Sequence, residues 1–132
     1  MKICISATGD NLDSSVDPRF GRAAYFLVGD SKEEDFEAIK NEATAMMRGA
    51  GISAAQKVVN KKVETVITGN IGPNAYNVLN SAGVKIYTVD VSKTAKQVLG
   101  EFNQGKLKEA KKATGPGFGP GIGRGMGRGN RW

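Results

Sequence analysis

The sequence lacks histidine altogether and has a single cysteine, Cys4, among its 132 residues. An ordinary zinc or transition-metal site needs three or four soft or borderline ligands, so histidine and cysteine cannot supply one within this chain. The lone cysteine also excludes an internal disulfide, and the missing histidine excludes a Ser–His or Cys–His catalytic pair. These absences argue against an ordinary metalloenzyme and against a triad hydrolase.

Long hydrophobic runs are missing as well. No apolar stretch approaches the roughly 20 residues of a membrane-spanning helix. The first residues, MKICISATGD, do not show the charged region, apolar segment and cleavage site that follow one another in a signal peptide. We therefore expect no membrane segment and a cytoplasmic location. Hydrophobic residues at 39% and charged residues at 24% are ordinary for one globular domain of this length.

Acidic residues are nearly absent from the C-terminal end. Residues 1–105 hold twelve basic and twelve acidic residues, whereas residues 106–132 hold seven basic residues and one acid, Glu109, so the net charge of +6 lies in this end segment. From Gly115 to Gly129 every second residue is glycine, a pattern that gives no driving force for a helix. We therefore expect the Gly/Arg-rich segment from Thr114 onward to be disordered when free.

A basic arm of this kind fits an anionic partner, and a purely solubilising role is the simpler alternative. Its three arginines, together with Phe118 and Trp132, also resemble arms that bind RNA through phosphate attraction and stacking. Nucleic-acid binding and a protein–protein adaptor role therefore stay open as second classes of function.

The rest of the chain shows strand periodicity first and helix periodicity later. Alternation of Ile3, Ile5 and Ala7 with other residues is typical of a strand. The pattern predicts strands over 2–7, 24–30, 36–42, 63–69 and 84–91, and helices over 52–61, 73–82 and 92–105, the last capped by Ser92. The order β-β-β-α-β-α-β-α predicts a three-layer α/β sandwich with a mixed five-stranded sheet.

Two glycine loops precede the first two predicted helices: Gly49 and Gly51 before the first, and Gly69 and Gly72 before the second. If the strands 2–7 and 63–69 are parallel neighbours, both loops emerge at the carboxyl edge of the sheet, where ligands of open α/β sheets bind. Free N–H groups at helix N-termini favour an anion there, and tight turns are the alternative explanation of the glycines.

Residues 49–54 also match the pattern G-x-G-x-x-A of dinucleotide-binding loops. No clear strand enters this loop, and the acid expected about 20 residues further on is missing. We therefore do not expect a nucleotide cofactor.

The segments VDPRFGRAAYF, GAGI and VITGNIGPNAYNVLNSAGVKIY resemble the dinitrogenase iron-molybdenum cofactor biosynthesis family. This family is related to nitrogenase cofactor carriers and to orange-protein-type binders of metal–sulfur clusters, and the resemblance covers about residues 1–107. It implies a ribonuclease-H-like α/β domain over residues 1–107, without hydrolase activity, followed by a basic Gly/Arg-rich disordered tail over residues 108–132. The implied function is non-catalytic binding, storage or delivery of anionic iron–sulfur or molybdenum–iron–sulfur clusters, with cluster donor or acceptor proteins as further partners.

The chain departs from the resembled pattern at two arginines. Nitrogenase carriers have a histidine where this chain has Arg19, and many relatives have one before the GAGI loop, where this chain has Arg48. A guanidinium can hydrogen-bond sulfide or oxide but cannot coordinate a metal. Outer-sphere binding is therefore implied, with a surface salt bridge as the simpler role of either arginine. The expected cluster-binding residues are Arg19, Gly21, Arg22, Arg48, Gly49, Gly51, Asn70, Gly72 and Asn74.

The soft side chains have simpler expected roles. Free cysteine is among the most buried residue types, so core packing is expected of Cys4 and thiolate ligation is the alternative. Met46 and Met47 are expected to fill gaps in the core, with thioether ligation as the alternative. The first predicted strand has no acid for a two-metal nuclease site, and we predict that the chain is not an enzyme.

Overall fold

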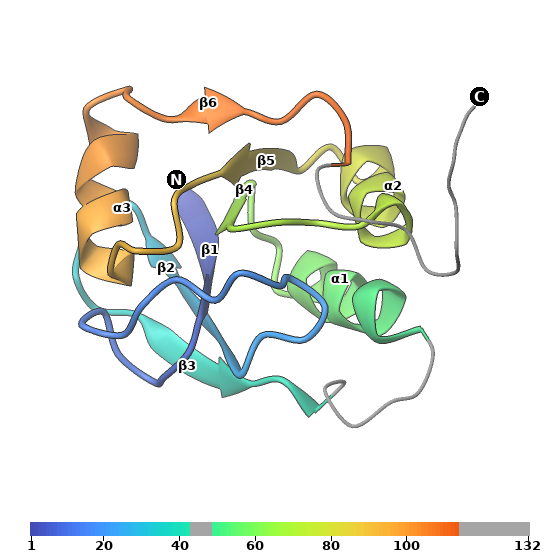
Figure 1. Ribbon diagram of the computed structural model, residues 1–132, viewed down its shortest axis with the longest axis horizontal. Coiled ribbons are helices and arrows are strands. Elements are labelled where there is room, and N and C mark those ends of the chain that lie inside the picture. The colour runs from blue at the N-terminus through green and yellow to red at the C-terminus, as the bar shows by residue number, and fades with distance from the viewer. Residues whose placement is uncertain (43–48, 114–132) are drawn as a thin grey trace.

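The structure is a computed structural model that describes residues 1–42 and 49–113. Its strands are β1 (Lys2–Ala7), β2 (Tyr25–Asp30), β3 (Glu37–Lys40), β4 (Thr65–Thr68), β5 (Lys85–Thr88) and β6 (Lys108–Glu109). Its helices are α1 (Ala50–Asn60), α2 (Pro73–Ser81) and α3 (Ala95–Asn103) (Figure 1). The expectations for Met46, Met47, Arg48 and the tail beyond Ala113 fall outside the described residues.

One mixed sheet connects all these strands in the order β3-β2-β1-β4-β5-β6. β1, β4 and β5 are parallel to one another, while β2, β3 and β6 pair antiparallel with their neighbours. The α/β class and the mixed sheet are as predicted, but the sheet has six strands, so the expected five is wrong. β6 was missed because a two-residue strand is too short to show periodicity.

The sixth strand, β6, lies beyond residue 107. β6 pairs with β5, and the N–H of Ala110 donates to the carbonyl of Ile86 at 2.7 Å. The hydroxyl of Tyr76 on α2 lies 3.5 Å from the Ala110 carbonyl. Residues 108–110 are therefore hydrogen-bonded to the sheet, past residue 107, where the family resemblance ends.

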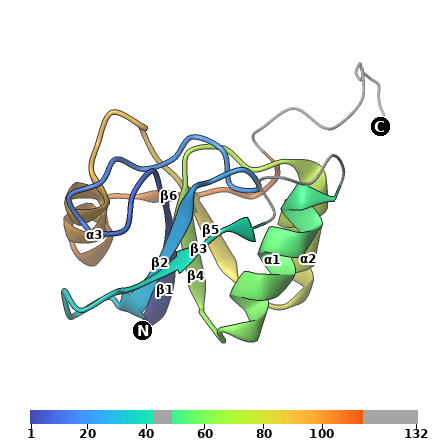
Figure 2. The same ribbon diagram turned by 90° about the horizontal axis from the view of Figure 1, so that it is seen from below.

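The helices cover both faces of the sheet. α1 and α2 lie on one face and α3 on the other (Figure 2). Alternate residues of β1 enter the two cores: Cys4 packs with the cluster under α1 and α2, whereas Ile3 and Ile5 pack with the cluster under α3. The protein is a three-layer α/β sandwich, as the periodicity predicted. Among the described helices, none is long and apolar enough to cross a bilayer.

Two helix starts differ from the prediction. α3 is capped by Thr94 rather than Ser92, because the Thr94 hydroxyl accepts the Gln97 N–H at 3.2 Å and the Gln97 amide oxygen accepts the Thr94 N–H at 2.9 Å. The N–H of Ser92 instead donates to Asp90 in a turn. α1 begins two residues early, at Ala50, directly after Gly49.

Candidate anion-binding site

A cavity of about 210 Å³ lies where the first turns of α1 and α2 meet the loop after Asp17. The residues between β4 and α2 form one wall, and the first turn of α1 forms another. The described lining consists of Arg19, Phe20, Gly21, Arg22, Gly49, Ala50, Gly51, Ile52, Asn70, Ile71, Gly72, Pro73, Asn74 and Ala75. None of these described lining residues is acidic.

The first turns of the two helices line this cavity, and their first backbone N–H groups have no acceptor within their own helix. The first N–H bonded within α1 is that of Ser53, which donates to Gly49 at 2.9 Å, and the first within α2 is that of Tyr76, which donates to Gly72 at 3.0 Å. The N–H groups of 50–52 and 74–75 therefore lie beyond the reach of any carbonyl of their own helix. Neither helix has a side-chain cap, so these donors carry the positive end of each helix dipole into the cavity.

Glycine is required at two points of this geometry for different reasons. Gly49 caps α1 with a φ of 74°, in the left-handed region that other residues rarely adopt. Gly21 packs against the first turn of α1, and a Cβ added there would lie 2.8 Å from the Cα of Gly51. The loop and the helix therefore approach backbone to backbone. Gly72 has an extended backbone and requires no positive φ.

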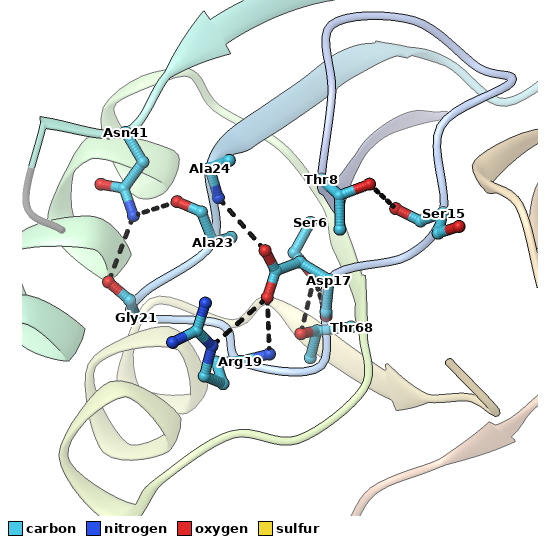
Figure 3. A network of polar contacts seen from close by, with 10 residues as sticks. All are labelled: Ser6, Thr8, Ser15, Asp17, Arg19, Gly21, Ala23, Ala24, Asn41 and Thr68. Carbon is cyan, nitrogen blue, oxygen red and sulfur yellow. Dashed lines mark hydrogen bonds and ion pairs between the residues drawn. The ribbon is translucent and has the colours of Figure 1, made fainter. Parts of the chain in front are cut away.

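The loop that carries Arg19 is held on both sides. The N–H of Phe20 donates to the carbonyl of Asn70 at 3.1 Å, and Arg19 and Asn70 form a parallel bridge. From the other side, the buried amide of Asn41 donates to the carbonyls of Gly21 and Ala23 at 3.1 and 2.9 Å (Figure 3). The loop is thus attached both to the residues before α2 and to those after β3.

Permanent positive charge reaches the cavity through arginine. The Arg19 side chain is 65% exposed, and its Nε lies 3.7 Å from Oδ1 of Asp17. Arg22, half-buried, lines the same cavity. With two helix N-termini beside them, these guanidinium groups make an electrostatic environment that favours a negatively charged ligand.

The structure brings together eight of the nine residues expected from the sequence to bind a cluster: Arg19, Gly21, Arg22, Gly49, Gly51, Asn70, Gly72 and Asn74. Arg48, the ninth, lies outside the described residues. Their role in binding stays a prediction. Sequence reasoning missed the apolar part of the lining, although each member adjoins an expected residue: Phe20, Ala50, Ile52, Ile71, Pro73 and Ala75.

Gly69, the remaining glycine of the two loops, has a packing role. A Cβ added there would lie 2.7 Å from the Cα of Pro18 and 2.5 Å from Cγ1 of Val91. Gly69 is therefore needed for close approach of the Pro18 loop to the end of β4.

Cys4 is in the core. Its side chain is fully buried among the apolar residues under α1 and α2, the position that core packing requires. Burial raises the pKa of the Cys4 thiol, because the charged thiolate is penalised away from water. In the part of the chain that the structure describes, no three His, Cys, Asp or Glu side chains gather into a metal site.

We expect Cys4 to resist iodoacetamide in the folded protein and to react fully in denaturant, as mass spectrometry would show. Since folding favours the protonated thiol, stability should fall as the pH rises above roughly 8.5, the ordinary thiol pKa. Rapid labelling of the folded protein at neutral pH would contradict the buried placement.

The fold and the cavity define a three-layer α/β protein with a small pocket between two helix N-termini. The sequence profile of the family described as "Dinitrogenase iron-molybdenum cofactor" matches residues 1–105. The chain belongs to this family.

Solved structures similar to this chain include the following two. The apo form of the orange protein from Desulfovibrio gigas is 35% identical with a TM-score of 0.83, over 86% of this chain and 96% of that one. A Thermotoga protein provisionally designated NifB, solved by NMR and placed in the DUF35 family, is 34% identical with a TM-score of 0.74, also over 86% and 96%. An uncharacterized protein of Methanocaldococcus jannaschii is 30% identical over 112 residues, which cover 83% of this chain and 91% of that protein.

Proposed function

We propose that the protein binds a preformed anionic metal–sulfide cluster as cargo in the cavity between α1 and α2, without catalysing a reaction. Storage and delivery are the two roles such binding serves, with cluster donor or acceptor proteins as partners in the cytoplasm. One observation carries the proposal: two helix N-termini without side-chain caps and the exposed Arg19 converge on one cavity with no acid in its described lining.

The energetics favour an anion. A helix N-terminus stabilises a negative charge by about 0.3–1 kcal/mol at an exposed site and up to about 2 kcal/mol when partly buried. Two termini add, and a hydrogen bond from a guanidinium contributes about 1.5–3 kcal/mol more. Together these terms give about 2–7 kcal/mol. Micromolar binding corresponds to about 8 kcal/mol, so it requires a ligand that accepts further hydrogen bonds from the N–H groups, as a compact multiply charged anion does.

The size and the lining of the cavity favour a metal–sulfide anion over a nucleotide or a phosphate. Its volume of about 210 Å³ is below the roughly 300–1,000 Å³ of pockets for organic ligands. Phe20, Ile52 and Ile71 make part of its wall apolar. Phosphate, which is strongly hydrated, loses hydration against such a wall, whereas sulfide ligands are larger, more polarisable and less hydrated.

The donor set fits outer-sphere binding. The chain has no histidine, Cys4 is buried elsewhere, and arginine cannot coordinate a metal. The metals would therefore keep their own sulfide ligands, and the protein would hold the cluster by N–H groups around it. The family's description and the likeness to the apo orange protein support a cluster as the cargo, and iron–sulfur and molybdenum-containing clusters both remain candidates.

Tetrathiomolybdate and molybdate provide a matched pair of ligands. Both are tetrahedral dianions, but the molybdenum carries sulfide ligands in the first and oxide ligands in the second. We expect the full chain to retain the colour of tetrathiomolybdate on desalting, and to bind molybdate at least tenfold more weakly in equilibrium dialysis. Arg19→Gln should weaken tetrathiomolybdate binding by about tenfold, the equivalent of 1.4 kcal/mol. Lys96→Gln is the control for net charge, because Lys96 belongs to α3, and α3 covers the opposite face of the sheet.

Equal affinity for the two dianions would contradict the sulfide preference. The cluster proposal fails if the protein retains neither tetrathiomolybdate nor a species assembled from iron and sulfide. Salt-sensitive retention of RNA without any retained colour would favour the nucleic-acid alternative.

A further inference from the structure

Asp17 is the one Asp, Glu, Lys or Arg residue among the buried residues of the described chain, at 3% exposure. It follows Val16 in the loop that leads from β1 to β2, at the carboxyl end of β1. Its backbone is tied to the centre of the sheet. The N–H of Asp17 donates to the carbonyl of Ser6 at 2.9 Å, and the Ser6 hydroxyl donates to the carbonyl of Asp17 at 3.0 Å.

This attachment reaches the neighbouring strand. Ser6 Oγ on β1 is also hydrogen-bonded to Thr68 Oγ1 at the end of β4, at 2.8 Å, and both side chains are buried. β1 and β4 are parallel neighbours in the middle of the sheet. The backbone of Asp17 is therefore attached to β1 directly and, through Ser6, to β4, the two central strands of the sheet.

The carboxylate of Asp17 faces the loop that borders the cavity. Its Oδ1 accepts the backbone N–H of Arg19 at 3.0 Å and lies 3.7 Å from Arg19 Nε. Its Oδ2 accepts the N–H of Ala24 at 3.3 Å. One carboxylate thus bridges the two ends of the loop 19–24 (Figure 3).

The same loop supplies four residues of the cavity lining, Arg19, Phe20, Gly21 and Arg22. Figure 3 shows Nε of Arg19 turned toward Asp17 and the other two guanidinium nitrogens pointing away from it. Contact through Nε leaves both of those nitrogens available to a ligand.

We propose that Asp17 is a positioning residue for anion binding: it fixes the backbone and the guanidinium of Arg19 at the mouth of the cavity. The inference rests on the proposed function, and it adds a residue that does not line the cavity. Asp17 acts through Arg19, so its contribution to affinity exists only while Arg19 is present. A residue that only stabilises the fold would act equally with and without Arg19.

The test is a double-mutant cycle in the full chain with tetrathiomolybdate as the probe. Asp17→Asn keeps the size of the side chain, but one of its two polar atoms becomes a donor and opposes an N–H of the loop. We expect D17N to weaken binding by about tenfold in the wild-type background and by less than twofold in the R19Q background. Its effect on the melting temperature should be the same in both backgrounds.

A second measurement does not depend on the variant being folded or on a ligand. In the wild-type protein, NMR should show the Arg19 Nε–H exchanging with water more slowly than that of free arginine, because Asp17 holds it. The assignment comes from the signal that R19Q removes. D17N, if it folds, should lose this slow exchange.

Equal losses of affinity from D17N in both backgrounds would overturn the inference and leave Asp17 as a structural residue. Unchanged or tighter binding by D17N would also overturn it, since the carboxylate would then only repel the anion. An Arg19 Nε–H that exchanges as fast as that of free arginine overturns it without the D17N variant. If the wild-type chain binds no tetrathiomolybdate and no iron–sulfide species, the proposed function fails first, and a slow Nε–H would show that the positioning contact exists without that ligand.

Discussion

Replacing Phe20 with alanine is expected to lower the free energy of unfolding by about 3–5 kcal/mol, the range for removing a buried aromatic side chain. Phe20 is 1% exposed, and its ring packs against Phe26 with 5.2 Å between centroids. The substitution leaves a void that the surrounding strands and loop fill only in part. Because Phe20 also lines the cavity, tetrathiomolybdate binding should fall at least tenfold. Urea denaturation followed by circular dichroism measures the first effect, and equilibrium dialysis the second.

Phe102→Ala is the matched control for this change. Phe102 also belongs to an aromatic pair, with its ring centroid 5.5 Å from that of Tyr87, but it is only partly buried and lies on the α3 face. Phe102→Ala should lower the free energy of unfolding by less than Phe20→Ala does, and it should leave tetrathiomolybdate binding unchanged. Equal loss of binding in the two variants would mean that binding reports global stability rather than the cavity wall.

Gly21→Ala is expected to lower the free energy of unfolding by about 1–3 kcal/mol and to abolish most tetrathiomolybdate binding. The new Cβ would lie 2.8 Å from the Cα and 3.0 Å from the N of Gly51, which are backbone atoms that cannot rotate away. The loop must therefore move off the first turn of α1, and the N–H groups there lose their position relative to Arg19. Thermal unfolding and equilibrium dialysis measure the two effects.

The matched control is Gly51→Ala, on the other side of the same contact. Its added Cβ would lie 3.4 Å from the Cβ and 3.9 Å from the N of Ala75, both ordinary contact distances. Alanine is also a better helix former than glycine, by about 1 kcal/mol. Gly51→Ala should therefore unfold at the same temperature as the wild type or a higher one. If Gly51→Ala destabilises the protein as much as Gly21→Ala, the close approach of the Gly21 backbone to the first turn of α1 does not explain the effect of Gly21→Ala.

The helix starts show what short-range patterns can predict. Pro73 at the first position of α2 and the glycine before it are local signals, and the structure begins α2 at Pro73. The start of α1 was placed two residues late, because a glycine in the first turn weakens the apolar stripe that marks a helix. Ser92 and Thr94 are both good capping residues, and only the reciprocal bond with Gln97 distinguishes them.

The candidate site was predictable for a different reason. Gly49 and Gly72 are far apart in the chain, but strand–helix alternation places the loops before parallel-sheet helices at one edge. Arg19 lies in the loop between β1 and β2, and it was expected from the family resemblance. The role of Asp17 was not predictable in this way. In the sequence it is one of several aspartates in a turn-rich loop, and only its burial beside Ser6 and Thr68 separates it from the others.

By itself, the sequence determined the α/β class, the absence of histidine ligands and the residues that could form an anion site, because periodicity, composition and turn chemistry are local properties of the chain. The tertiary structure decided how many strands the sheet has, which aspartate is buried and how closely Gly21 approaches α1. These depend on contacts between residues distant in the chain, whose distances are set by packing and hydrogen bonding in the folded state.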